Sequence, residues 1–191
     1  YVFAQLLSLY RELPAYHAAV RAGKWQQSDH FCLLDYPIHE LHGQTLGIIG
    51  YGELGHAVAR AGEAFGMRVL VAERANVAPR EGRTPLGTVL AESRVVSLHC
   101  PLTAHTRNLI GGNELAQMRQ DAVLVNTARG GIVDIGILRD GQADFDIASL
   151  ADFMPNNWSS WPTPYQRVSI EKQSAAEVVI LTGYGTVQSA V

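Results

Sequence analysis

The chain has 191 residues, 47% of them hydrophobic and 17% charged, so it can bury a core and is not disordered. Its 15 Lys and Arg against 18 Asp and Glu give a net charge of −3 with no basic run, which argues against nucleic acid or an anionic membrane as a partner. No apolar run reaches the roughly 18 residues that span a bilayer. The two cysteines, Cys32 and Cys100, lack metal-ligand spacing. We therefore expect a cytoplasmic protein without a metal site.

The first 40 residues predict helices followed by a connection. Apolar residues at positions 2, 3, 6, 7 and 9 have helical spacing, and no capping residue precedes them, so we expect the chain to be a fragment of a longer protein. A second short helix is expected over residues 15–24, and a polar connection over 25–41. Trp25 and Phe31 are expected to pack against the core.

A different pattern begins at residue 41. Residues 46–49 predict a buried strand that runs into the turn Gly50-Tyr51-Gly52-Glu53-Leu54-Gly55. A helix over 56–65, ended by Gly66, and a second strand over 67–72 follow, and the acid Glu73 comes directly after them. Strand, glycine-rich turn, helix, strand and acid in this order match the dinucleotide-binding fingerprint.

Each glycine of the turn has a predicted role. Gly50 permits the tight turn, Gly52 lets a pyrophosphate approach the backbone, and Gly55 lets the helix pack close to the sheet. The amides at the start of the helix would donate to the phosphates. The cofactor-binding residues predicted here are Gly50, Tyr51, Gly52, Glu53, Leu54 and Gly55.

Glu73 and its neighbour bear on the choice of cofactor. Glu73 would accept hydrogen bonds from the adenosine ribose, and its charge would repel a 2′-phosphate, which favours NAD. Arg74 is included among the cofactor-binding residues because it could pair with that phosphate, so NADP stays open.

Strands and helices continue to alternate. A helix is expected over 86–93, a strand over 95–98, a helix capped by Asn113 that ends near residue 118, and a strand over 123–126. This alternation predicts an α/β fold of the Rossmann type, a doubly wound parallel sheet with helices on both faces. Such sheets bind ligands at the carboxyl ends of their strands. The polar residues that follow the strands, Glu73, His99, Thr127 and Arg129, should therefore meet at one edge.

Three motifs in order, GIIGYGELG, HCPLTAHTRNLIG and VNTARGGIVD, resemble the coenzyme-binding domain of the D-isomer-specific 2-hydroxyacid dehydrogenases, most of all hydroxypyruvate reductase or glycerate dehydrogenase. The resemblance covers residues 1–140. It implies an inter-domain helix and connection over 1–40, an NAD(P)-binding domain over 41–140, and a divergent, unassigned segment over 141–191. The flanking substrate domain is expected to be largely absent. The activity implied is hydride transfer between nicotinamide and C2 of a small 2-keto or 2-hydroxy acid such as hydroxypyruvate, glyoxylate or D-glycerate, in a homodimer formed through this domain.

The resemblance also implies roles for single residues. Arg129 would be the catalytic arginine, since its planar guanidinium can hold a carboxylate through two hydrogen bonds. Asp152 would meet the nicotinamide carboxamide. His99 is expected to be structural or adjacent to the cofactor. The residues implied on the nicotinamide and ribose side are His99, Cys100, Pro101, Thr106, Thr127 and Ala128.

The sequence departs from the family from about Ile135 onward. The family's acid–base pair is a Glu and a His downstream of the arginine, yet the last histidine here is His105. The chain is therefore expected to bind cofactor and to turn over slowly or not at all. Three interpretations of the tail remain open: a divergent C-terminus, a frameshifted stretch, which we favour, and a docking segment.

Two other function classes remain open as well. A non-catalytic NAD(H)-sensing module of the corepressor type would share the fold and bind NAD without chemistry. A methyltransferase that uses S-adenosylmethionine would share the glycine-rich turn and the acid, but not HCPLT or NTARGG.

Overall fold

The computed structural model describes residues 1–75, 77–134, 143–146, 167–170 and 179–182, and over these it forms the expected α/β fold. Five parallel strands lie in the order β2-β1-β3-β4-β7. They are β1 (Thr45–Ile49), β2 (Arg68–Val71), β3 (Val95–Leu98), β4 (Val123–Asn126) and β7 (Val179–Thr182). A separate antiparallel pair is formed by β5 (Ala143–Asp146) and β6 (Arg167–Ile170).

The helices begin and end close to the predicted positions except for α3, a four-residue helix that lies mostly within the predicted connection over 25–41. They are α1 (Val2–Tyr10), α2 (Leu13–Arg21), α3 (Lys24–Gln27), α4 (Glu53–Ala64), α5 (Leu86–Glu92) and α6 (Gly112–Gln117), with a 3-10 turn η1 (Gly130–Ile132). The expectation that Asn113 caps α6 is wrong. Gly111 is the N-cap, and its backbone N–H donates to the Glu114 carboxylate at 3.0 Å. The side chain that caps α6 is therefore Glu114, the third residue of the helix. None of the helices in the described ranges is long and apolar enough to cross a membrane.

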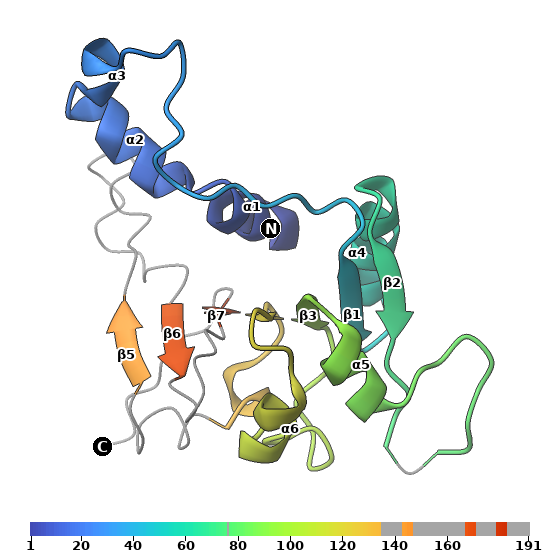
Figure 1. Ribbon diagram of the computed structural model, residues 1–191. Coiled ribbons are helices and arrows are strands. Elements are labelled where there is room, and N and C mark those ends of the chain that lie inside the picture. Colours follow the sequence, from blue (N-terminus) through green and yellow to red (C-terminus); the bar gives the residue numbers. More distant parts are fainter. Residues whose placement is uncertain (76, 135–142, 147–166, 171–178, 183–191) are drawn as a thin grey trace.

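Two cores form on the two faces of the sheet because side chains alternate along each strand. Leu46, Ile48 and Val125 pack on one face with residues of α1 and α4. Val96 and Leu124 pack on the other face with residues of α5 and α6. Helices therefore cover both faces, as the doubly wound fold requires (Figure 1). A ligand would bind at the ends of the strands rather than on a face of the sheet.

The strand order places the change of direction between β1 and β3. The chain passes from β1 to its neighbour β2 on one side, and β3 then pairs with β1 on the other side, with Ile49 opposite Leu98. In open parallel sheets, ligands bind outside the carboxyl ends of the strands at such a switch point. The turn after β1 and the residues after β3 lie at this point.

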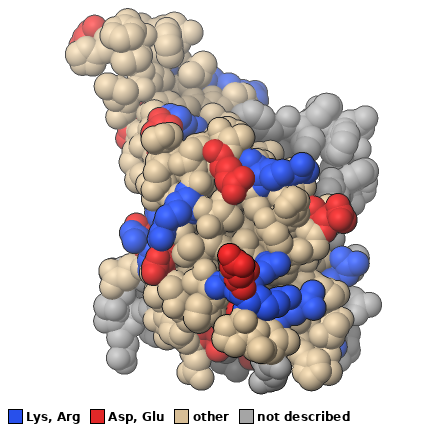
Figure 2. All heavy atoms as spheres, turned by 90° about the vertical axis from the view of Figure 1, so that its right-hand side faces the viewer, with Lys and Arg blue, Asp and Glu red and all other residues tan. Residues whose placement is uncertain are grey.

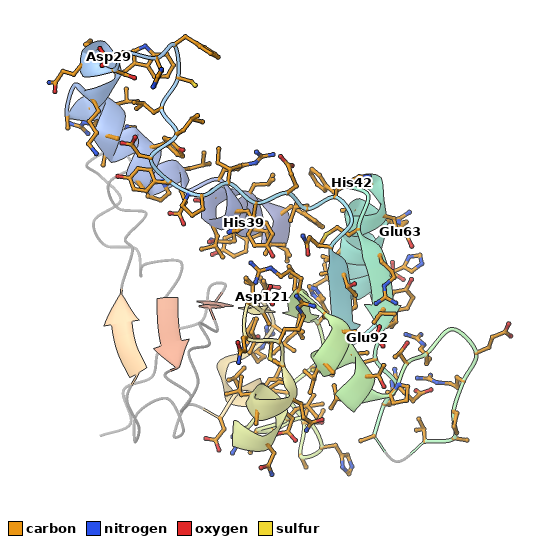
Figure 3. The ribbon with its side chains drawn as sticks, in the orientation of Figure 1. Asp29, His39, His42, Glu63, Glu92 and Asp121 are labelled. Atoms are coloured by element: carbon orange, nitrogen blue, oxygen red, sulfur yellow. The ribbon has the colours of Figure 1, made fainter. Side chains whose placement is uncertain are left out.

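The amino ends of the strands lie at the opposite side of the sheet, which we call its amino edge, and α1 packs there. Val2, Leu6 and Tyr10 of α1 are buried, so the opening helix packs on the sheet. The Tyr10 ring lies 5.5 Å from the Arg94 guanidinium, and Arg94 pairs with Asp121 at 3.5 Å. Burial raises the pKa of Tyr10 to about 12. Figure 3 shows Asp121 on the side of the sheet that faces α1.

Residues 12–38, which we call the arm, extend from α1 away from the sheet and contain α2 and α3 (Figure 1). The prediction that Trp25 and Phe31 pack against the core is wrong: their exposed fractions are 51% and 92%. The arm also exposes Leu13, Val20, Leu34 and Ile38. These exposed apolar side chains therefore lack a covering surface in the described part of the chain.

The segment left unassigned from the sequence contributes a strand to the main sheet. β7 pairs in parallel with β4, with Val123 opposite Val179 and Asn126 opposite Thr182. Asp152 and most of the rest of residues 141–191 lie outside the described residues.

Candidate nucleotide-binding site

The glycine turn after β1 packs directly against the end of β3. Gly50 has a φ of +96°, and a Cβ there would lie 2.5 Å from the Cys100 backbone nitrogen. A Cβ at Gly55 would collide with the carbonyl oxygen of Gly50. Both positions therefore need glycine for contact within the protein, which agrees with the turn and packing roles predicted for them.

Gly52 differs from these two glycines because a Cβ there would meet nothing within 4 Å. It is the N-cap of α4, and its φ of −84° is one that any residue adopts. The protein itself does not require glycine at this position. The open space lies at the start of a 12-residue helix, where Glu53 and Leu54 contribute the first backbone N–H groups. This arrangement fits the close approach of a pyrophosphate.

Glu73 follows β2, and an arginine that the sequence analysis did not single out holds its carboxylate. The Arg80 Nη2 lies 2.5 Å from Glu73 Oε1, and the Arg80 Nε donates to both carboxylate oxygens at 3.0 and 3.3 Å. The backbone N–H groups of Arg74 and Arg80 also donate to it, at 2.8 and 3.0 Å. These hydrogen bonds, with that from the Arg80 side chain the largest cause, lower the pKa of Glu73 to about 2.

The loop after β2 also contacts the glycine turn. The Arg83 guanidinium lies 4.6 Å from the centroid of the Tyr51 ring, and Tyr51 is in edge contact with His56 of α4. Figure 2 shows acidic and basic side chains interspersed on the face that carries this loop and β2. Both Tyr51 and Glu73 therefore have an arginine of the same loop as partner.

His99 and Cys100 follow β3 and face the turn from the other side. The His99 backbone N–H donates to the Ile49 carbonyl at 2.7 Å, and the ring Nε2 of His99 lies 2.8 Å from Ser97 Oγ. Burial lowers the pKa of His99 to about 4, so its ring is neutral near pH 7. Burial also raises the pKa of the Cys100 thiol, which disfavours the reactive thiolate.

The turn after β4 is organised by Asn126, a residue that the sequence analysis passed over. Its Oδ1 accepts the Ala128 N–H at 3.1 Å, and its Nδ2 donates to the Arg129 carbonyl at 2.8 Å. Asn126 is 4% exposed. A polar residue at the end of the apolar strand VLVN was the available signal. The Arg129 side chain is exposed, and its Nη1 donates to the Ala128 carbonyl at 2.8 Å.

The loops after β3 and β4 lie side by side. The Asn108 N–H donates to the Gly131 carbonyl at 2.9 Å, and Ile110 and Val133 form a parallel bridge. Within the first loop, the Thr106 hydroxyl donates to the Pro101 carbonyl at 2.5 Å, so it closes that loop on itself. Thr127 is half-buried at the end of β4.

The described structure thus brings most of the predicted residues to one edge. The glycine turn, Glu73, His99, Cys100, Thr127 and Arg129 all follow carboxyl ends of neighbouring strands. Asp152 lies outside the described residues. Among the side chains that the structure describes, no group of three His, Cys, Asp or Glu could hold a metal ion.

Comparison with known proteins decides the family. Residues 3–184 match the family model for the D-isomer specific 2-hydroxyacid dehydrogenase, NAD binding domain. The chain belongs to this family. The match extends past residue 140, where the resemblance of the motifs ended.

Named members of the 2-hydroxyacid dehydrogenase family are similar in sequence and in structure. Glycerate dehydrogenase of Methylorubrum extorquens is 44% identical over 156 residues, which are 78% of this chain and 49% of that protein. Glyoxylate reductase of Thermococcus litoralis is 37% identical over 71% of this chain and 43% of that protein. The structure of D-lactate dehydrogenase from Aquifex aeolicus, solved with NAD and lactic acid, matches with a TM-score of 0.59 at 36% identity, over 70% of this chain and 40% of that one. The chain spans about half the length of the curated relatives it matches.

The neutral state of His99 predicts that this domain loses stability in acid. Between pH 6.5 and about 4 the unfolded chain binds a proton on this ring and the folded chain does not, so stability falls as pH falls. The free energy of unfolding should fall between pH 7 and pH 5, and we expect His99→Gln to make this fall smaller by about 1 kcal/mol. The value allows for partial screening of the ring by solvent. Urea denaturation at both pH values measures it. His105→Gln, at an exposed position, is the control, and an equal change there would contradict the assignment.

Proposed function

We propose that the chain is the coenzyme-binding half of a cytoplasmic, NAD-dependent D-2-hydroxyacid dehydrogenase that acts on a small acid such as hydroxypyruvate, glyoxylate or D-glycerate. The observation that carries the proposal is the open space at Gly52 beside the start of α4, at the switch point of a sheet that belongs to this family. The names of the relatives, glycerate dehydrogenase and glyoxylate reductase, support the substrate class.

Different residues around this space would bind different parts of NAD. The backbone from Gly50 to Gly55 would take the pyrophosphate, and Glu73 would accept from the adenosine ribose. His99, Cys100 and Thr127 would border the part nearer the reaction. When bound, the nicotinamide supplies or accepts the hydride at C2 of the acid.

Arg129 is the proposed ligand of the substrate carboxylate. Its guanidinium is exposed and bonded only to the Ala128 carbonyl among the contacts described for its side chain. A carboxylate forms stronger, charge-assisted hydrogen bonds than a carbonyl does, so it would replace this partner. Asn126 is the positioning residue, because it fixes the backbone of the turn that carries Arg129.

Proton transfer is the step that this sequence does not supply. Reduction of a 2-keto acid needs a proton on the new alkoxide, and the family pattern places a histidine after the arginine for that purpose. The sequence has no histidine after His105. We infer that the chain binds cofactor and carboxylate without efficient turnover.

NADH binding tests the site directly. We expect NADH to bind the purified chain, and Gly52→Val to weaken binding by about 10-fold or more because the side chain would fill the approach to the pyrophosphate. Titration followed by NADH fluorescence measures the affinity. Urea denaturation should show that this variant still folds, with a loss of about 1 kcal/mol because valine is a poorer N-cap of α4 than glycine. Gly55→Val is the comparison for loss of binding through misfolding, since its Cβ would collide with Gly50 and should destabilise the fold. Undiminished NADH binding by a folded Gly52→Val variant would refute the assignment.

Turnover tests the missing acid. With NADH and hydroxypyruvate, or NADH and glyoxylate, we expect the loss of absorbance at 340 nm to stay at the level without protein, because no histidine follows Arg129 in the sequence to donate the proton. Rapid turnover would mean that another group donates it. NADH binding without turnover in a longer version of the protein that carries a substrate domain would favour the NAD(H)-sensing alternative.

The arm is the proposed contact between two copies. Its exposed apolar side chains, above all Phe31 and Leu34 at 92% and 75% exposure, form the kind of surface that associates in water. We expect a dimer, and the double variant Phe31→Glu with Leu34→Glu to be monomeric by light scattering after size-exclusion chromatography. Leu54→Glu, at 74% exposure but away from the arm, should stay dimeric. A monomeric parent chain would contradict the proposal.

A further inference from the structure

Glu73 already has a full set of hydrogen-bond donors. An ionised carboxylate offers about four acceptor positions, and here its two oxygens receive five N–H contacts from two residues, Arg74 and Arg80. The Glu73 side chain is 13% exposed. The adenosine ribose needs the same lone pairs, so it cannot bond to Glu73 while the Arg80 guanidinium occupies them.

Arg74 and Arg80 differ in the donors that they direct to the Glu73 carboxylate. Arg74 contributes its backbone N–H to Glu73, whereas Arg80 contributes both its backbone N–H and its guanidinium. The Arg80 side chain is 45% exposed, so it can leave the carboxylate and remain solvated. The backbone N–H of Arg80 would keep the residue beside Glu73 after its guanidinium has left.

The ion pair also changes the electrostatic argument for NAD. Selectivity against NADP rests on repulsion between the Glu73 carboxylate and a 2′-phosphate. A guanidinium paired with that carboxylate cancels much of the repulsion, and it is itself a planar donor suited to phosphate. The Arg83 guanidinium over Tyr51 adds a second positive charge from the same loop.

We propose that Arg80 determines the cofactor specificity of this site, by competing with the ribose hydroxyls for Glu73 and by offering a cation to a 2′-phosphate, so that the chain binds NADPH as well as NADH. The inference rests on the proposed function, since it assumes that the adenosine ribose meets Glu73. It assigns to Arg80 the role that the sequence suggested for Arg74.

A merely structural role makes a different prediction. If Arg80 only holds the loop after β2 against Glu73, its removal would loosen that loop and weaken NADH and NADPH equally. If Arg80 acts as proposed, its removal would weaken NADPH and leave the affinity for NADH equal or tighter. The ratio of the two affinities therefore separates the roles.

The experiment titrates NADH and NADPH into the parent chain, Arg80→Met and the matched control Arg74→Met, with urea denaturation to confirm folding. For the parent chain we expect the two dissociation constants to lie within about 10-fold of each other. Arg80→Met should weaken NADPH by about 10-fold and leave NADH equal or up to about 3-fold tighter, while Arg74→Met should change their ratio by less than about 3-fold. Rising salt should weaken NADPH more for the parent than for Arg80→Met.

Three outcomes would overturn the inference. They are NADH binding by the parent without measurable NADPH binding, an equal loss of both in Arg80→Met, and loss of NADPH selectively in Arg74→Met. A parent chain that binds neither nucleotide would instead contradict the proposed function. If Arg80→Met failed to fold, Arg80→Lys would serve, since it keeps the charge without the planar fork and should weaken NADPH by a smaller factor.

Discussion

The close contact between the turn after β1 and the end of β3 is the constraint on which the rest of the site depends. A Cβ at Gly50 would lie 2.5 Å from the Cys100 nitrogen, so only glycine lets these two backbones meet. Their meeting brings the start of α4, which follows the turn, to the switch point of the sheet. Gly52 lies between these two tightly packed glycines, yet a Cβ at Gly52 would meet nothing within 4 Å. Close packing at Gly50 and Gly55 thus fixes the turn, while the backbone at Gly52 stays open beside the start of α4.

The two edges of the sheet serve different purposes. At the amino edge, Tyr10 of α1 lies over Arg94, which pairs with Asp121, and the edge is closed by a buried helix. At the carboxyl edge the connections are glycine turns and polar loops held by single side chains such as Asn126 and Thr106. The first edge is thus closed by packing and ion pairing, while the proposed nucleotide site lies at the second. The arm continues from α1, so its apolar surface lies away from the proposed nucleotide site (Figure 1).

Much of the fold could be predicted from the sequence because its signals are local. Buried parallel strands appear as short apolar runs, and β3 and β4 have the predicted bounds. The roles of Gly50 and Gly55 could be predicted because the glycine spacing stands in a run of strand, turn, helix, strand and acid that is continuous in the sequence. The arm was misjudged because the exposure of Phe31 depends on which surfaces lie nearby, and no local pattern reports that. Asn126 was missed for a related reason, since its hydrogen bonds join backbone groups that only the turn brings together.

Arg80 shows where reasoning from a motif ends. The fingerprint predicts an acid after β2, and Glu73 is that acid, but a motif says nothing of what else binds it. The partner comes from an irregular loop seven residues further on, where neither helical nor strand periodicity relates the two side chains. The adjacent Arg74 was the natural candidate from sequence, because adjacency is the one relation that sequence shows directly. The side chains of neighbouring residues point away from each other, whereas the loop brings Arg80 back beside Glu73. The more distant arginine is therefore the one whose side chain reaches the carboxylate. The preference of such a site for a cofactor is therefore a property of the acid together with the loop that folds back on it.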